Sequence, residues 1–237
     1  MTPKAFNRTR SLINSFEKKG VRATQGSLRL EVNLGTSASY TFAVNDNQTK
    51  LVTEIRLRSG DAFVPTKVGL FTRKSAGATP TDAAHAVSVL QTYPNSIVYS
   101  QTNEAANLEA IYSSRLQITV NSVNLTETID TINFRRVDMA QQGVAVSTQG
   151  AGSAPGIYQK SAWQGGDYGF INYEQDICFN GQANNNVILN LATAVNCTDQ
   201  QTTALTQNYA VLIFRGILLL NGAGVAQDKS IKTFIRR

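Results

Sequence analysis

The strongest constraint on the fold of this chain is a regular alternation of apolar and polar side chains. In the stretch SLRLEVNL the apolar residues are Leu28, Leu30, Val32 and Leu34, with polar or charged residues between them. Successive side chains of a β-strand point to opposite faces of a sheet. The spacing therefore predicts a strand that buries one face and exposes the other.

The same kind of signal returns along the chain. Short alternating or apolar segments, bounded by turn residues, predict further strands. They are YTFAV (40–44), KLVTEIRLR (50–58), AFVPTKVGLF (62–71), RLQITVN (115–121), IDTINFRRV (129–137), NNNVILNLA (184–192) and YAVLIFRGILLL (209–220). The last is long and almost continuously apolar, which predicts a central strand buried on both faces. Pro65 has no N–H to give to a sheet, so we expect it at an edge or a bulge.

Helical and loop signals are fewer. The segment NEAANLEAIYSS (103–114) predicts one short helix with an apolar face, capped by Asn103. Residues 74–86 are predicted to form a surface loop, and the Gly/Ser/Ala-rich residues 143–156 a long mobile loop. No repeat and no linker divides the body, so we expect residues 23–227 to form one domain.

Positive charge is concentrated at the two ends of the chain. Residues 1–22 carry five net positive charges and residues 228–237 carry three, whereas residues 23–227 have a net charge of −2. Basic ends of this kind meet phosphates or anionic lipid headgroups, and the simpler alternative is that they only solubilise the termini. The candidate contact residues are Lys4, Arg8, Arg10, Lys18, Lys19, Arg22, Lys229, Lys232, Arg236 and Arg237.

The first segment has the pattern of a short amphipathic helix. Pro3 suits the first helical turn, and Gly20 suits a helix stop. Phe6, Ile13 and Phe16 fall on one side of such a helix, opposite most of the basic side chains. We expect either this helix or an arm that becomes helical when its apolar side docks on a membrane or a neighbouring subunit.

Residues suited to catalysis or metal binding are scarce. The two cysteines, Cys178 and Cys197, match no metal or redox spacing, and the single histidine, His85, has the small-residue surroundings of a loop. No phosphate-binding, dinucleotide or hydrolase motif is present. We therefore expect no enzyme activity, no metal, no cofactor and no small-molecule substrate.

Targeting signals are also missing from the sequence. There is no signal peptide and no apolar span of about eighteen residues. We expect a protein made in a reducing cytosol, neither secreted by a classical signal nor embedded in a membrane.

An aromatic stretch offers the best candidate for a ligand site. Trp163, Tyr168 and Tyr173 lie beside Asp167 and Asn172, as in loops that bind sugars through a flat ring and planar hydrogen-bonding groups. The alternative is a loop packed over the domain or against a neighbouring subunit, with the aromatic residues as interface anchors. We favour the alternative.

The overall composition favours self-association. Hydrophobic residues make up 42% of the chain, enough for a core, but charged residues only 16%, below the usual quarter. A surface so poor in charge is weakly protected against association, so we expect burial against identical copies. A monomer with a neutral surface is the alternative.

The basic arm, the strand-rich neutral body and the closing stretch from Asn208 to Arg237 together resemble the jelly-roll major capsid (coat) proteins of small tailless bacteriophages. The resemblance implies an all-β fold, an antiparallel jelly-roll β-sandwich over residues 23–227. It further implies a basic N-terminal helical arm over residues 1–22, one short helix in an insertion, and a basic tail over residues 228–237.

In function, the resemblance implies a structural virion protein. Identical subunits would self-assemble into an icosahedral capsid with other virion proteins, after synthesis in the host cytoplasm. The arms would contact packaged nucleic acid or the lipid of an inner membrane without sequence specificity. The alternative is a phage or cell-surface β-sandwich that binds a carbohydrate or a receptor.

Overall fold

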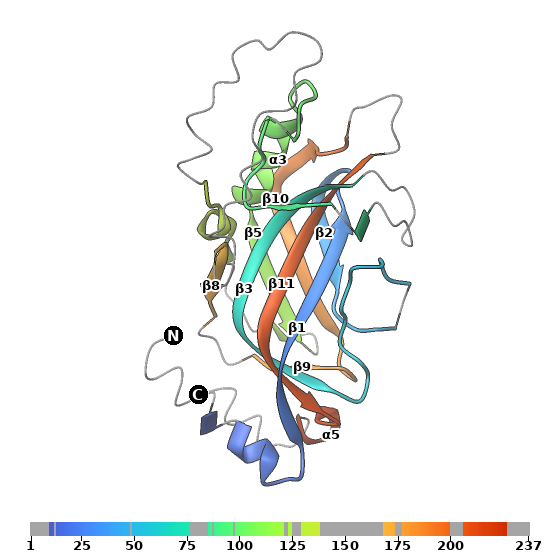
Figure 1. Ribbon diagram of the computed structural model, residues 1–237, viewed down its shortest axis with the longest axis vertical. Coiled ribbons are helices and arrows are strands. Elements are labelled where there is room, and N and C mark those ends of the chain that lie inside the picture. The colour runs from blue at the N-terminus through green and yellow to red at the C-terminus, as the bar shows by residue number, and fades with distance from the viewer. Residues whose placement is uncertain are drawn as a thin grey trace.

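Two antiparallel sheets contain most of the regular structure in the computed structural model of this chain (Figure 1). The structure describes residues 10–11, 13–47, 49–75, 85–86, 88–96, 98–120, 123–124, 129–137, 168–173, 177–199 and 206–226. The predicted loop at residues 143–156 lies outside these ranges.

Sheet A is built on three long strands in the order β1–β11–β3, and three short strands pair with the free edge of β3. The long strands are β1 (Arg22–Asn33), β11 (Gln207–Leu220) and β3 (Ala62–Ser75). The short strands are β4 (Leu90–Gln91), β8 (Phe170–Asn172) and β9 (Phe179–Asn180).

Sheet B has the order β2–β10–β5, and two short strands pair with β5. The main strands are β2 (Thr36–Ala43), β10 (Asn185–Asn196) and β5 (Arg115–Val120). The short strands are β6 (Val123–Asn124) and β7 (Ile129–Asp130), which follow one another along the same edge of β5.

The order of pairing gives the fold its name. The first strand pairs with the last (β1–β11), the second with the one before it (β2–β10), and the third with the next two inward (β3–β9 and β3–β8). β5 pairs with β6 and β7, which close the series. An antiparallel ribbon rolled up in this way is a jelly roll, so the predicted all-β jelly-roll sandwich is confirmed.

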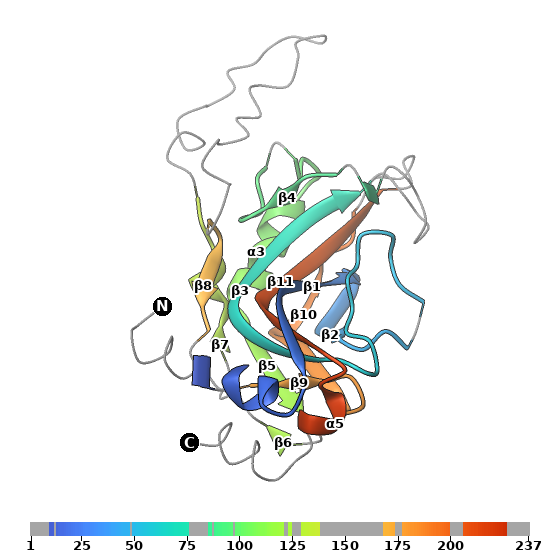
Figure 2. The same cartoon turned by 60° about the horizontal axis from the view of Figure 1, so that its bottom comes forward.

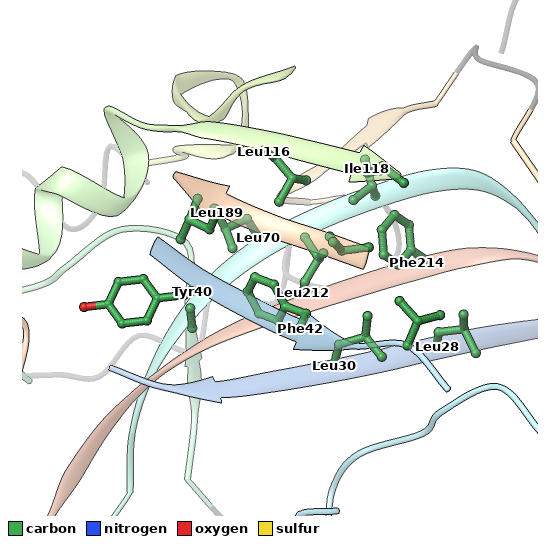
Figure 3. Close-up of a cluster of buried hydrophobic side chains, with 14 of the residues drawn as sticks. Leu28, Leu30, Tyr40, Phe42, Leu70, Leu116, Ile118, Leu189, Leu212 and Phe214 are labelled. Carbon is green, nitrogen blue, oxygen red and sulfur yellow. The ribbon is translucent and has the colours of Figure 1, made fainter. Parts of the chain in front are cut away.

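The core lies between the two sheets, as Figure 3 shows. The inward positions of each long strand alternate with outward ones, and Leu28 and Leu30 of β1 are buried as the alternation predicts. Other fully buried members are Phe42, Leu70, Leu116, Ile118, Leu189, Leu212 and Phe214. Each Å² of apolar surface removed from water stabilises the fold by about 25 cal/mol, so this layer is the main stabilising element.

β11 is the central strand of sheet A, as its continuous hydrophobicity predicts. Val211 and Leu212 are neighbours that point to opposite faces, and both are completely buried. Leu212 belongs to the core between the sheets, whereas Val211 packs with Phe71 and Tyr209 on the outer face of sheet A. The predicted irregularity at Pro65 is also confirmed, because the β3–β11 register shifts at this point.

The segment at residues 50–58 is not the predicted strand. It makes isolated bridges instead, one of them between Ile55 and Arg29 at the free edge of β1. The Glu54 carboxylate accepts a hydrogen bond from the backbone N–H of Leu51 at 2.7 Å, which curls the segment. Alternation alone cannot reveal this local competition between a side chain and the sheet.

The predicted strand at residues 129–137 is present only as β7. A 3₁₀ helix, η1 (Thr131–Phe134), follows, because the Asp130 side chain accepts a hydrogen bond from the Ile132 N–H at 3.1 Å. A short polar side chain that caps a turn in this way ends a strand.

The predicted helix is confirmed as α3 (Glu104–Tyr112), but its predicted cap is wrong. Asn103 has a φ of 63° and makes no side-chain cap. The Glu104 carboxylate accepts a hydrogen bond from the Gln101 N–H at 3.2 Å instead.

The predicted surface loop at residues 74–86 is wrong at both ends. Lys74 and Ser75 belong to β3, and His85 is completely buried. Strand β3 therefore runs further than the drop in hydrophobicity suggests.

Candidate functional site

Both ends of the described chain meet at one end of the sandwich, which we call the basic pole (Figure 2). Residues 13–17 are helical, the helix ends before Gly20 at a φ of +79°, and Val21 leads into β1. At the other end of the chain, α5 (Ala223–Ala226) follows β11. The two segments share one buried apolar cluster of Phe16, Val21, Ala62, Val64, Cys178, Leu219 and Ala226.

This cluster corrects the expected role of the arm. Phe16 was predicted to present its ring to a membrane or a neighbouring subunit, but it is completely buried against its own domain. The sequence offered no sign of this intramolecular contact, because an amphipathic pattern does not say which surface the apolar side meets.

The basic residues of the pole are exposed where the structure describes them. Arg10 precedes the helical residues 13–17, Lys18, Lys19 and Arg22 follow them, and all four are exposed. The other predicted contact residues lie outside the described residues, namely Lys4, Arg8, Lys229, Lys232, Arg236 and Arg237. The described part of the pole therefore carries exposed basic side chains on a segment that Phe16 and Val21 fix to the domain.

The outer face of sheet B is almost free of charge. Cross-strand register places three residues each from β2, β10 and β5 in a three-by-three array, which we call the neutral face. They are Ser39, Thr41, Ala43, Asn186, Ile188, Asn190, Arg115, Gln117 and Thr119. All nine are exposed or half-buried, and Arg115 is the only ionisable residue in the array. Identical faces of this kind can approach one another without like-charge repulsion.

A buried group of charges lies on the outer face of sheet A, and we call it the Glu31 cluster. Arg73 Nη1 donates to both carboxylate oxygens of Glu31, at 3.1 and 3.0 Å, and both side chains are completely buried. Arg29 Nε donates to Glu31 Oε1 at 2.8 Å, and the Thr53 hydroxyl donates to the same oxygen at 2.5 Å. His85 Nε2 lies 2.9 Å from Glu31 Oε2.

The surroundings of these groups fix their protonation. Burial by itself raises the pKa of Glu31, but the hydrogen bond from Thr53 and the charges of Arg29 and Arg73 together lower it below its usual value. Burial, with the nearby Arg73 charge, lowers the pKa of His85. At pH 7 the imidazole is therefore neutral, and its Nε2–H donates to the ionised Glu31.

The sequence contained no signal for this cluster. Glu31 occupies an outward position of β1, where a carboxylate is expected to be solvated, and His85 is 54 positions away in the chain. Tertiary structure buries both, because Thr53 from residues 51–55 bonds to Glu31, Ser88 from the described residues 85–86 and 88–91 bonds to Arg73, and the two segments cover these side chains. The Glu31, Arg73 and His85 side chains are closed to solvent, so a substrate has no access to them.

The aromatic candidates do not form one described site. Trp163 lies outside the described residues, and Tyr168 is half-buried. Tyr173 is only 6% exposed and belongs to the main core. The Tyr173 ring is therefore part of the packing and is closed to a ligand.

A shallow pocket of about 330 Å³ lies at the start of β11, lined mostly by amide and hydroxyl side chains. Its charged lining residue among those described is Asp199, which Lys74 binds at 3.3 Å. Lys74 also binds the buried Glu104 at 3.0 Å. Asp199 is therefore paired within the protein, and no other charged residue is found among the described lining residues.

Metal and membrane features are limited to the following findings. No group of His, Cys, Asp and Glu suited to a metal ion occurs among the described residues. Across the same ranges, every helix is too short or too polar to cross a bilayer. Cys178 and Cys197 are free and buried, and burial raises their pKa values to about 12 and about 11.

Comparison with known proteins gives a structural likeness but no sequence match. No protein-family model matches this sequence, and a search of curated proteins finds no match either. The chain is similar in structure to VP54 of PBCV-1, solved as a crystal structure fitted into a cryo-EM reconstruction of the virophage Sputnik. The identity is 9% and the TM-score 0.34, over 92% of this chain.

The match spans 46% of the VP54 chain, so this protein covers about half the length of that one. The jelly-roll assignment of this chain rests on its own strand pairing.

Proposed function

We propose that this protein is a structural virion protein whose copies self-assemble into an icosahedral bacteriophage capsid, with the basic pole directed to the interior. The observation that carries the proposal is that the first and last described segments of the chain meet at one pole. Phe16 and Val21 pack there against Leu219 and Ala226. Five net positive charges precede residue 23 and three follow residue 227, while the body between them is slightly acidic.

This distribution gives the domain an electrostatic polarity. A cationic end binds polyanions by releasing their counterions, without reading a sequence. The proposed partners of the pole are packaged nucleic acid or the lipid of an inner membrane, both of which present dense phosphate. A net charge of −2 over residues 23–227 leaves the rest of the surface little affinity for either.

The neutral face supports the second half of the proposal, contact between identical subunits. Its amide and hydroxyl side chains can both donate and accept hydrogen bonds, so the neutral faces of two copies can hydrogen-bond to each other. Ile188 at its centre adds apolar area. Interfaces between copies are typically depleted of charge in this way.

The remaining parts of the proposal follow from the role of a subunit in a capsid shell. The protein would be made in the host cytoplasm and reside in the virion, in contact with other virion proteins. It would act without enzyme activity, cofactor or small-molecule substrate.

The test compares the full-length chain with a chain that lacks residues 1–22, by light scattering and negative-stain microscopy, with and without added DNA. The full-length chain is expected to form closed particles of uniform size, and the shortened chain to lose them. A full-length chain that stays monomeric at high concentration with DNA present would overturn the proposal.

The alternative, a carbohydrate- or receptor-binding sandwich, makes a different prediction. It requires binding on a glycan array that is lost on Trp163→Ala. The burial of Tyr173 removes one of its three aromatic contacts, which is why we favour the shell.

A further inference from the structure

The Glu31 cluster joins two covering segments to sheet A. Thr53, from residues 51–55, donates to Glu31 and accepts from Arg73 Nη1 at 3.0 Å. In the described residues 85–86 and 88–91, His85 donates to Glu31, and the Ser88 hydroxyl accepts from Arg73 Nε. Both segments therefore bond to the same two side chains of the sheet.

The charge balance of the cluster depends on a neutral His85. Glu31 is the one carboxylate that bonds to the guanidinium groups of both Arg29 and Arg73. Arg73 Nη1 lies 3.2 Å from His85 Nε2, and the Tyr209 ring packs edge-on against the imidazole at 4.6 Å between centroids. A proton on His85 would add a third positive charge to a single carboxylate.

No other described group can absorb that charge. Glu54, a buried carboxylate bonded to the Glu31 backbone, pairs with Arg56 at 2.7 Å and accepts hydrogen bonds from the backbone N–H groups of Glu31 and Leu51. His85 Nδ1 has no hydrogen-bond partner among the described residues and is shielded from water. A buried charge without compensation costs several kcal/mol, whereas the same charge in water costs nothing extra.

The covering segments are attached much more weakly than the strands below them. Residues 88–91 pair with β3 at two positions only, and residues 51–55 pair with β1 through one isolated bridge, at Ile55. By contrast, β11 pairs along nearly its whole length with β1 on one side and β3 on the other. Local opening draws on the least stable elements first.

We propose that the Glu31 cluster is an acid-sensitive clasp. Protonation of His85 releases residues 51–55 and the described residues 85–86 and 88–91, which include the short edge strand β4, while the long strands of both sheets stay folded. The surface then changes character. In the closed form, with both segments in place, Val52, Ile55 and Val89 are about half exposed. In the open form, with the segments released, the apolar side chains of Phe71, Tyr209 and Val211 become exposed.

The direction of the pH effect follows from the linkage between proton binding by His85 and release of the two segments. Burial lowers the pKa of His85 in the closed form, so the open form binds the proton more readily. Below the ordinary histidine value of about 6.5, the open population rises by up to tenfold per pH unit, until His85 titrates in the closed form as well. Glu31, whose pKa is lowered, stays ionised in this range and does not contribute.

The test uses the fact that His85 is the only histidine in the chain. The imidazole Cε1–H signal of the full-length protein is followed by NMR from pH 8 to pH 5. Hydrogen exchange of peptides covering residues 49–58 and 85–91 is measured over the same range and corrected for intrinsic rates. We expect the protection of these peptides to fall with pH while that of β1 and β11 is unchanged.

Two variants separate the clasp from general acid sensitivity. In His85→Gln the side-chain amide still donates to Glu31 but cannot be charged, so protection should not depend on pH between 7 and 5. Glu109→Gln, which alters an ion pair with Arg135 outside the cluster, should behave like the wild type.

Equal protection of the wild-type segments at pH 7 and pH 5 would overturn the proposal, as would an unchanged pH dependence in His85→Gln. If His85→Gln does not fold, the wild-type data decide. A His85 signal that titrates at or above the ordinary value, with the segments still protected, is then the contradicting result.

Discussion

Replacement of Glu31 by Gln isolates the contribution of the buried carboxylate. The change keeps the shape of the side chain and removes its charge. Arg73, which is completely buried, and Arg29 then lose the anion that both bind. The Thr53 hydroxyl and the His85 ring keep only a neutral amide as partner.

The size of the effect follows from this burial. Removing one partner of a buried ion pair costs about 3–5 kcal/mol, because the other charge is left without compensation. Glu109→Gln is the matched control, since Glu109 and Arg135 form a 2.8 Å pair with both side chains more than a third exposed. An exposed pair contributes about 0–1 kcal/mol.

Urea unfolding of the wild type and both variants, at pH 7, gives the free energies of unfolding. We expect a loss of about 3–5 kcal/mol for Glu31→Gln and at most about 1 kcal/mol for Glu109→Gln. The double variant Glu31→Gln/Arg73→Met should lose less than the sum of its single changes, because it removes the uncompensated charge. Equal losses in the two single Glu variants would refute this account of the cluster.

Three further perturbations test the rest of the structure. Phe16→Ala removes the buried side chain that anchors the arm, at a cost of about 3 kcal/mol. Trypsin should then cut after Lys18 or Lys19 about a hundredfold faster, and an unchanged cleavage rate would mean that the arm is not docked. Gly216→Ala would place a Cβ 2.0 Å from the Val64 carbonyl oxygen, so thermal unfolding should show a loss of about 1–3 kcal/mol, whereas Gly224→Ala, with open space around it, should show none. Native protein at pH 8 should not react with a thiol reagent, because burial raises the pKa of Cys178 to about 12; prompt modification of the folded chain would contradict this.

The sandwich itself was predictable from the sequence because its strands follow simple alternation. Leu28 and Leu30 of β1 and the long apolar run of β11 have the patterns that a half-buried and a central strand require, and both are confirmed. Pairing partners were not predictable in the same way, since period-two alternation does not say which strands meet. The jelly-roll expectation came from a resemblance, and the strand order supports it.

The sequence reasoning failed where side chains act across long distances. Residues 50–58 alternate like a strand, yet Glu54 and the edge of β1 decide their path. His85 has loop-like neighbours, yet a bond to Glu31, far away in the chain, buries it. Phe16 has the position of an exposed contact residue, yet it anchors the arm to its own domain. In each case the local pattern does not reveal the partner that decides the structure.

The central claim is that copies of this domain form a shell with the basic pole inside. The most direct measurement is a cryo-EM reconstruction of particles formed by the full-length chain, into which the jelly roll is fitted. The account predicts a closed shell in which Phe16 and α5 face the interior and density for nucleic acid or lipid lies beneath them. A shell with this pole on its outer surface, or a chain that forms no particles at all, would contradict it.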